Sequence, residues 1–213
     1  MTFVISGFTT PSPHPHPPAI ENPSLVNMMI LLVVIVTGGI HARTSVELLS
    51  SNGTRLCSLP NLPAGRYRHS QAGLVACGGD TSEMTSCVTF SAGSWKKTHA
   101  LGSRVFGHTA WASPRGVLLM GGRYGMSTTK LLMDNGQTSP SFNLANNRWL
   151  HCGIEDGEEV VLTGGYSRGT VKQSTVTRYN IQGRATPLPS LNTARLYHAC
   201  GRFKKSDGAT VSQ

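Results

Sequence analysis

The sequence lacks most of the patterns that identify enzymes and membrane proteins. It contains no glycine-rich phosphate loop followed by lysine, no Gly-x-Ser-x-Gly nucleophile elbow and no His-Glu-x-x-His zinc motif. Its long apolar run, residues 25–36, is interrupted by Asn27 and is too short for a bilayer, which requires about 20 apolar residues. These absences predict a protein that is not an enzyme, needs no metal or cofactor and has no membrane span.

Acidic residues are scarce, with 10 Asp and Glu against 19 Lys and Arg, and the formal net charge is +9. A basic chain attracts nucleic acids and other anionic surfaces. The basic residues are dispersed, however: no run of five occurs, and the adjacent pairs are Lys96-Lys97 and Lys204-Lys205. We therefore expect solvated charges on strands and loops, and no nucleic-acid partner.

Cysteines are few and odd in number, five in all, which favours free thiols in a reducing compartment and so a cytoplasmic location. Cys77 directly precedes a glycine pair and is expected to pack as a small buried hydrophobe. Two features keep a secreted alternative open. One is the glycosylation sequon Asn52-Gly53-Thr54, and the other is the apolar run, which would read as a signal sequence from Met28 except that no Lys or Arg precedes Arg43.

The sequence does contain a repeat. A short apolar run that ends in two glycines occurs four times, with 40, 43 and 43 residues between successive first glycines. A constant period of this size indicates a repeat architecture. A turn glycine follows the second glycine by 14 residues in three repeats and by 18 in the fourth, so the fourth repeat carries an insertion. The glycine pairs are Gly38 and Gly39, Gly78 and Gly79, Gly121 and Gly122, and Gly164 and Gly165.

Two further landmarks keep the phase of the repeat. The turns Asn52-Gly53 and Asn135-Gly136 predict two-residue hairpins in which both central residues take positive φ. An arginine followed by a histidine recurs at Arg66/His69, Arg104/His108, Arg148/His151 and Arg195/His198. We expect these arginine and histidine side chains to satisfy buried backbone carbonyls between repeats.

These residues resemble the kelch repeat, in which an apolar strand ends in Gly-Gly and a later hairpin leads to a strand with tryptophan. Trp95 lies where that tryptophan belongs, and the resemblance covers about residues 28–203. The other repeats lack the tryptophan, and the period is shorter than the ~50 residues usual for kelch. The resemblance implies an all-β, kelch-type β-propeller of about four blades, each a four-stranded antiparallel sheet.

The repeat predicts how the chain is divided. Residues 1–24 form a Pro/His-rich tail that is extended or disordered, 25–205 the propeller, and 206–213 a second tail. The first blade lacks a strand before its apolar run, and 195–203 repeats the opening strand of a further blade. Either Leu196–Phe203 completes the first blade in a closed ring, or the blades form an open arc truncated from a six- or seven-bladed parent. Unpaired blade edges would then allow self-association. The blades span approximately 28–65, 66–103, 104–147 and 148–194.

The loops after the glycine pairs would gather on one face, where recognition residues concentrate in rigid scaffolds. We expect this face to bind a protein or peptide partner with acidic groups. Alternatives are a secreted carbohydrate- or matrix-binding propeller and, on the resemblance alone, a galactose-oxidase-like copper enzyme, for which no matching set of tyrosines and histidines is found. Besides Asp80 and Glu83, the loops offer Arg43, Arg123, Tyr124, Tyr166 and Arg168, of residue types favoured as interface anchors.

Two remaining clusters are interpreted as structural. Glu155-Asp156-Gly157-Glu158-Glu159 lies on one predicted hairpin tip, whereas the carboxylates of a glycosidase face each other across a substrate. His151-Cys152 and His198-Ala199-Cys200 look like zinc-ligand pairs but occupy equivalent positions in successive repeats. We therefore expect a solvated turn in the first case and a repeated core pattern in the second.

Overall fold

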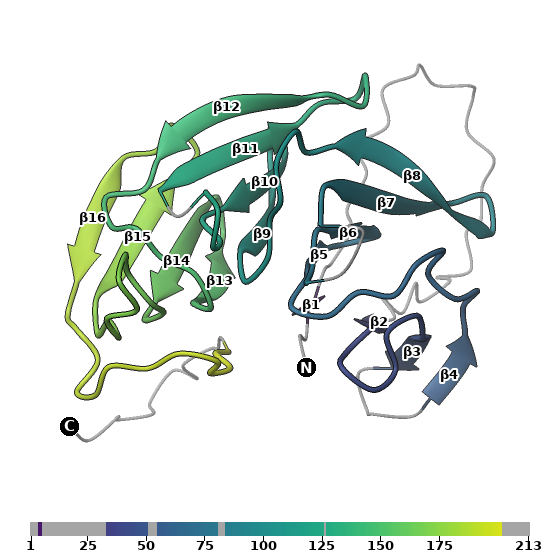
Figure 1. The fold of residues 1–213 in the computed structure, drawn as a ribbon, viewed down its shortest axis with the longest axis horizontal. Coiled ribbons are helices and arrows are strands. Elements are labelled where there is room, and N and C mark those ends of the chain that lie inside the picture. The colour runs from purple at the N-terminus through teal and green to yellow at the C-terminus, as the bar shows by residue number, and fades with distance from the viewer. Residues whose placement is uncertain (1–3, 6–32, 51–54, 81–83, 126, 202–213) are drawn as a thin grey trace, which may run out of the picture.

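The computed structural model describes residues 4–5, 33–50, 55–80, 84–125 and 127–201. These residues form four antiparallel sheets of four strands each, and no helix occurs among them. The sheets follow one another in an open, propeller-like arc (Figure 1). The predicted all-β fold of about four four-stranded blades is therefore confirmed at the level of a propeller-like array.

Every sheet is a meander in which strands adjacent in sequence are paired. The first sheet contains β1 (Val4–Ile5), β2 (Val33–Thr37), β3 (Val46–Ser50) and β4 (Arg55–Ser58). The second contains β5 (Ser70–Ala72), β6 (Val75–Cys77), β7 (Ser86–Ser91) and β8 (Ser94–Ala100). The third contains β9 (Thr109–Ser113), β10 (Gly116–Met120), β11 (Thr128–Leu132) and β12 (Thr138–Asn143). The fourth contains β13 (Cys152–Asp156), β14 (Glu159–Thr163), β15 (Val176–Asn180) and β16 (Ala185–Leu188).

The sheets pack face to face. Alternate side chains of a strand point to opposite faces of its sheet, so every second residue lies against a neighbouring sheet. Along β15, for example, Thr177 and Tyr179 are buried and their neighbours are not. Each junction between successive sheets has its own apolar cluster. These clusters centre on Val88 and Trp95 at the first junction, Cys77 and Leu119 at the second, and Trp111 and Leu162 at the third.

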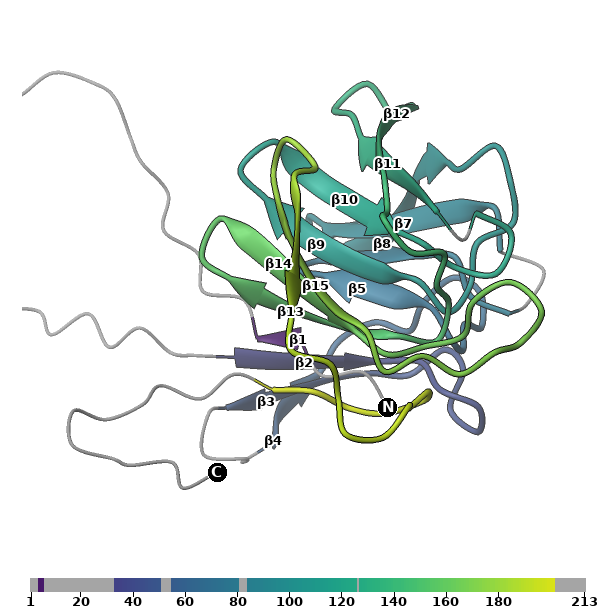
Figure 2. The same ribbon diagram turned by 90° about the vertical axis from the view of Figure 1, so that its left-hand side faces the viewer.

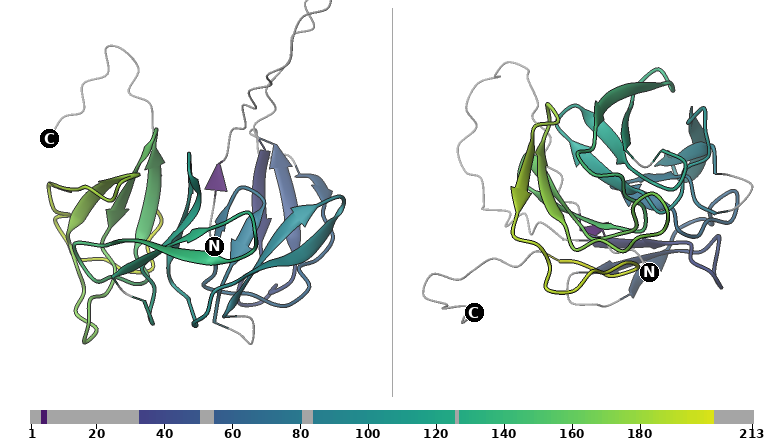
Figure 3. Two further views of the ribbon diagram at one scale, coloured as in Figure 1. Left: turned by 90° about the horizontal axis from the view of Figure 1, so that it is seen from above. Right: turned by 60° about the vertical axis from the view of Figure 1, so that its left-hand side comes forward.

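The first sheet is completed by β1, rather than by a strand from Leu196–Phe203 as one prediction held. Val4 and Ile5 pair with Ile35 and Val34 on β2, and residues 196–201 form no strand. The β1 strand lies inside the predicted tail 1–24 and is too short to produce a sequence pattern. The segment that follows β16 instead runs back toward the middle of the arc (Figures 1 and 3).

Some predictions fall on residues outside those described. They concern the rest of the tail 1–24, the C-terminal tail 206–213, the sequon at Asn52 and the loop residue Glu83. Within the described residues, no helix is long and apolar enough to cross a membrane.

The hairpin at Asn135-Gly136 forms, but with a different turn from the one predicted. Gly136 has φ +80°, whereas Asn135 is not among the residues with positive φ. The Asn135 side-chain oxygen instead accepts a hydrogen bond from the N–H of Gln137 at 3.0 Å, and Met133 N–H bonds Gln137 O at 3.0 Å. The loop between Met133 and Gln137 therefore contains Asp134 in addition to the two predicted turn residues, and Gly136 is its last residue. Both central residues take positive φ at Ala92-Gly93.

The prediction of free thiols is wrong for four cysteines, which form the disulfides Cys77–Cys87 and Cys152–Cys200. The register of β6 and β7 sets Cys77 directly opposite Cys87, so the two sulfurs meet inside the core. Cys152 begins β13, and its disulfide ties the segment after β16 to the fourth sheet. Both pairings depend on how strands and loops are brought together, which a count of cysteines does not reveal.

Candidate functional site

The candidate site lies at one end of the array, which we call the loop face. Because strands alternate in direction, the segments joining second to third strands and those joining one sheet to the next lie at the same end. These loops are on the right in Figure 2. The loop face comprises the described residues of 38–45, 59–69, 78–85, 101–108, 121–127, 144–151, 164–175 and 189–201.

Four short segments that lead into successive repeats form the inner rim of this face, and we call them entry segments. They are 66–69, 105–108, 148–151 and 195–198. The residue before each histidine has φ between +52° and +63°. Backbone N–H groups link these residues in series, from Gly107 to Arg68 O (2.9 Å), from Leu150 to Gly107 O (2.7 Å) and from Tyr197 to Leu150 O (3.2 Å).

The glycine pairs dock against the entry segment of the following repeat. A Cβ on Gly78, for instance, would lie 2.2 Å from Val105 O, which excludes any side chain there. Bonds at the four pairs run from Gly39 N–H to Arg66 O (3.0 Å), Gly79 N–H to Val105 O (2.9 Å), Gly122 N–H to Arg148 O (3.0 Å) and Gly165 N–H to Arg195 O (2.7 Å).

Two entry-segment arginines are fully buried and bind backbone carbonyls, but these carbonyls belong to the sheet that each arginine precedes and do not lie between repeats as predicted. Arg66 donates to Gly78 O at 2.7 Å and to Ser86 O at 2.9 Å. Arg148 donates at 3.4 Å to the equivalent carbonyls of Gly164 and Thr175. In the third repeat the prediction was wrong, because the equivalent position is held by buried Val105, while Arg104 is exposed.

The histidines do not bind carbonyls as predicted. His69 and His198 each place Nε2 2.8 Å from a threonine hydroxyl, that of Thr37 and Thr163 respectively. His108 and His151 are buried, and neither ring nitrogen of either residue has a hydrogen-bond partner among the described residues. Burial lowers the pKa of His108 to about 3 and that of His69 to about 4, and it also lowers the pKa of His151 well below its ordinary value.

Cys152 and Cys200, which the sequence set beside these histidines, are joined to each other in a disulfide. Among the described residues, no three His, Cys, Asp or Glu side chains gather as a metal ion would require.

Outside the rim, Arg43 belongs to a first cluster of arginine and tyrosine. The Arg43 guanidinium lies over the Tyr67 ring at 5.2 Å, and Arg68 lies between Tyr67 (5.5 Å) and Tyr197 (5.3 Å). Asp80 holds the cluster together, because its Oδ2 accepts bonds of 3.0 Å from both the Tyr67 hydroxyl and Arg68. This hydrogen bond and the nearby carboxylate raise the pKa of Tyr67.

The structure brings Arg123, Tyr124 and Tyr166 together in a second cluster. The Arg123 guanidinium lies 5.2 Å from the Trp149 ring and 5.7 Å from the Phe106 ring. Tyr124 meets Phe106 edge to face at 5.7 Å, and Tyr166 packs on Trp149 at 5.4 Å. The sequence interpretation missed Phe106 and Trp149. Their signal is an aromatic residue two positions before the histidine of the repeat.

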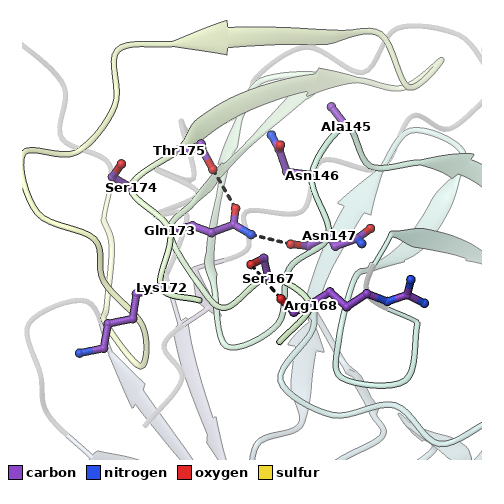
Figure 4. Close-up of a pocket in the computed structure, with 9 residues that line it drawn as sticks. All are labelled: Ala145, Asn146, Asn147, Ser167, Arg168, Lys172, Gln173, Ser174 and Thr175. Carbon is purple, nitrogen blue, oxygen red and sulfur yellow. Dashed lines mark hydrogen bonds between the residues drawn. The ribbon is translucent and has the colours of Figure 1, made fainter. Parts of the chain in front are cut away.

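Arg168 belongs to neither cluster. It lies in the lengthened loop of the fourth repeat, beside an open groove of about 560 Å³ (Figure 4). Gln173 spans the groove by donating from Nε2 to Asn147 O at 2.7 Å. The Arg168 and Lys172 side chains extend to opposite sides of Gln173, so the groove is polar with a cation on each flank. Its lining is Ala145, Asn146, Asn147, Ser167, Arg168, Lys172, Gln173, Ser174 and Thr175.

The loop face combines positive charge with exposed apolar groups. Asp80 is its one carboxylate among the described residues, against seven exposed basic residues: Arg43, Arg68, Arg104, Arg123, Arg168, Lys172 and Arg195. Of the five large apolar residues that are exposed in the described part of the chain, the loop face has Ile40 (59%), Tyr124 (55%), Val171 (62%) and Tyr197 (59%). Arginine and tyrosine together are typical anchors of protein interfaces.

Comparison with known proteins defines the fold and nothing finer. No family model matches the sequence, and no curated protein matches it either. Among solved structures, that of YjhT is similar, with a TM-score of 0.65 and 13% sequence identity. The match covers 76% of this chain, which spans 63% of the YjhT chain.

Proposed function

We propose that this chain is a non-enzymatic kelch-repeat module whose loop face binds an acidic protein or peptide. The observation that carries the proposal is the concentration of exposed arginines and large apolar residues on the loop face, with a single carboxylate among them. Positive potential on this face would steer an acidic partner and select it over basic competitors.

The second cluster is the centre of the proposed surface. Arg123 is held over two rings whose backbones belong to the inner rim, so its side chain loses little freedom when a carboxylate binds. Tyr124 stands beside it with 55% of its surface exposed and supplies an apolar contact. A partner segment that presents an acidic residue next to an apolar residue fits this pair.

The proposal is tested with labelled synthetic peptides, one rich in Glu and Leu and one rich in Lys and Leu. We expect the acidic peptide to bind, more weakly as salt rises, and the double variant Arg123→Ala/Tyr124→Ala to lose about tenfold or more in affinity. The control is Arg115→Ala/Met133→Ala, which removes an exposed arginine and an exposed apolar residue at the opposite end of the array. Equal binding of both peptides, equal loss in both variants, or no binding of the acidic peptide would contradict the proposal.

A secreted carbohydrate- or matrix-binding propeller is the second candidate. The two disulfides favour an oxidising compartment, and the groove at Gln173 offers amide and hydroxyl groups suited to a polar ligand. The cytoplasmic location stays a prediction from the cysteine count. Glycan binding that Gln173→Ala abolishes and Arg123→Ala/Tyr124→Ala leaves intact would favour this second candidate.

A further inference from the structure

Among the described residues, the inner rim contains one entry segment that leads into no sheet and one glycine pair that receives no entry segment of its own. Segments 66–69, 105–108 and 148–151 each pack against the glycine pair of the sheet that they precede. Segment 195–198 has the same backbone form, but no strand follows it in the described residues. At the other end of the arc, Gly38 and Gly39 belong to the sheet without a described entry segment.

The unmatched segment leaves exposed the arginine that two of its equivalents bury, while its Leu196 is partly buried against the cluster of Phe106, Trp149 and Leu150. Arg66 and Arg148 are 0% exposed because each inserts into its own sheet and binds the carbonyl of the first glycine there. Arg195 holds the same position and is exposed. Two hydrogen bonds hold the backbone of segment 195–198 in the same conformation as its equivalents. Arg195 O accepts from Gly165 N–H at 2.7 Å, and His198 bonds to Thr163.

No described residue packs against the second glycine of the unmatched pair. A Cβ on Gly79, Gly122 or Gly165 would lie within 3.1 Å of an atom of its own entry segment. A Cβ on Gly39 would meet no atom of the described residues within 4 Å. The residue after the pair, Ile40, is 59% exposed.

The side chains beside the unmatched glycine pair and in the unmatched entry segment are also chemically compatible. In the complete repeats, the residue after the glycine pair contacts the second residue of the entry segment: Asp80 bonds to Tyr67, Arg123 lies over Phe106, and Tyr166 packs on Trp149. The corresponding residues at the open ends are Ile40 and Leu196, both aliphatic.

We propose that residues 195–198 of one copy dock against Gly38, Gly39 and Ile40 of a second copy. Arg195 then donates to the Gly38 and Ser45 carbonyls, as Arg66 does to those of Gly78 and Ser86, and Leu196 packs on Ile40. Within one chain Tyr197 contacts Arg68 at 5.3 Å, but no described residue lies within 4 Å of a Cβ on Gly39. Since every copy carries one end of each kind, two copies satisfy both junctions in a closed head-to-tail dimer. The junction uses Ile40 and Arg195 and leaves Arg123 and Tyr124 exposed for the proposed partner.

The test is sedimentation velocity of the full chain over a range of concentrations. We expect a monomer–dimer equilibrium that Arg195→Ala and Ile40→Asp each weaken by about tenfold or more. The controls are Arg184→Ala, an exposed arginine at the opposite end of the fourth sheet, and Val171→Asp, an exposed apolar residue elsewhere on the loop face. Circular dichroism checks that all four variants keep the wild-type fold, which their exposed positions predict.

A mixing experiment separates this junction from a symmetric one. Arg195→Ala keeps an intact glycine-pair end, and Ile40→Asp keeps an intact entry segment, so the mixed variants share one undamaged junction. The other junction of the mixed dimer carries both substitutions, whereas a dimer of either variant has two damaged junctions. Where one substitution already breaks a junction, the second adds no further loss there, so we expect the mixture to dimerise more strongly than either variant alone. The proposal would be overturned if the wild-type chain stayed monomeric. It would also be overturned if the control variants weakened the dimer as much as Arg195→Ala and Ile40→Asp, or if the mixed variants dimerised no more strongly than each variant alone.

Discussion

The inner rim and the loops outside it share one end of the molecule but follow different rules. Along the rim the backbone is the same at every repeat, with a left-handed residue before each histidine and a glycine N–H bonded to the next entry segment. In the loops outside, equivalent positions hold Ile40, Asp80, Arg123 and Tyr166, which differ in charge, size and exposure. The comparison shows that the repeat preserves backbone geometry at the rim and leaves side-chain chemistry free to vary beyond it.

The largest difference is expected between two glycines that both have positive φ. Gly78→Ala would set a Cβ 2.2 Å from Val105 O, whereas a Cβ on Gly93 meets nothing within 4 Å. Gly93→Ala should therefore cost about 1 kcal/mol for backbone strain alone, and Gly78→Ala about 4 kcal/mol or more, or it should prevent folding. Urea denaturation of both variants measures the difference. Equal losses would show that the rim tolerates movement of the entry segment.

The next effect concerns two arginines two residues apart. Arg66→Met leaves the buried carbonyls of Gly78 and Ser86 without the guanidinium and should cost about 3 kcal/mol. Arg68→Met removes a half-exposed ion pair with Asp80 at 3.0 Å and should cost less than about 1 kcal/mol. Thermal unfolding of the two variants under the same conditions compares a buried with an exposed side chain of one entry segment. A larger loss in Arg68→Met would contradict the distinction.

A third effect is a dependence of stability on pH. The folded-state pKa values of His69 (about 4) and His108 (about 3) lie below the unfolded value of 6.5, so the unfolded chain takes up protons first as pH falls. Each histidine should therefore cost about 2 kcal/mol of stability between pH 7 and pH 5, and nothing above pH 7.

The variant His108→Leu tests the origin of that pH dependence. The His108 ring makes no hydrogen bond to the described part of the chain, so we expect little loss of stability at pH 7 and a shallower decline toward pH 5 than in wild type. Denaturation curves at a series of pH values measure both quantities. An unchanged slope would assign the acid sensitivity to other groups.

The periodic features were predictable because they recur in the chain itself. The four glycine pairs, the strands on either side of them and the described turn glycines Gly93, Gly136 and Gly183 mark places where backbone must approach backbone or reverse direction. Arg66 and Arg148 were also predictable as donors to buried carbonyls. Arg104 was not, because one additional residue before His108 moves it out of phase and brings Val105 into the arginine position.

The sequence by itself determined the period, the all-β class and the residues that the rim requires, since each is a local steric or hydrogen-bonding condition repeated along the chain. Only the tertiary structure decided which distant residues meet. Cys77 faces Cys87 through strand register, Arg123 rests on Phe106 and Trp149 through the packing of neighbouring repeats, and β1 completes the first sheet. These contacts depend on how sheets pack around the arc, and no local pattern encodes that arrangement.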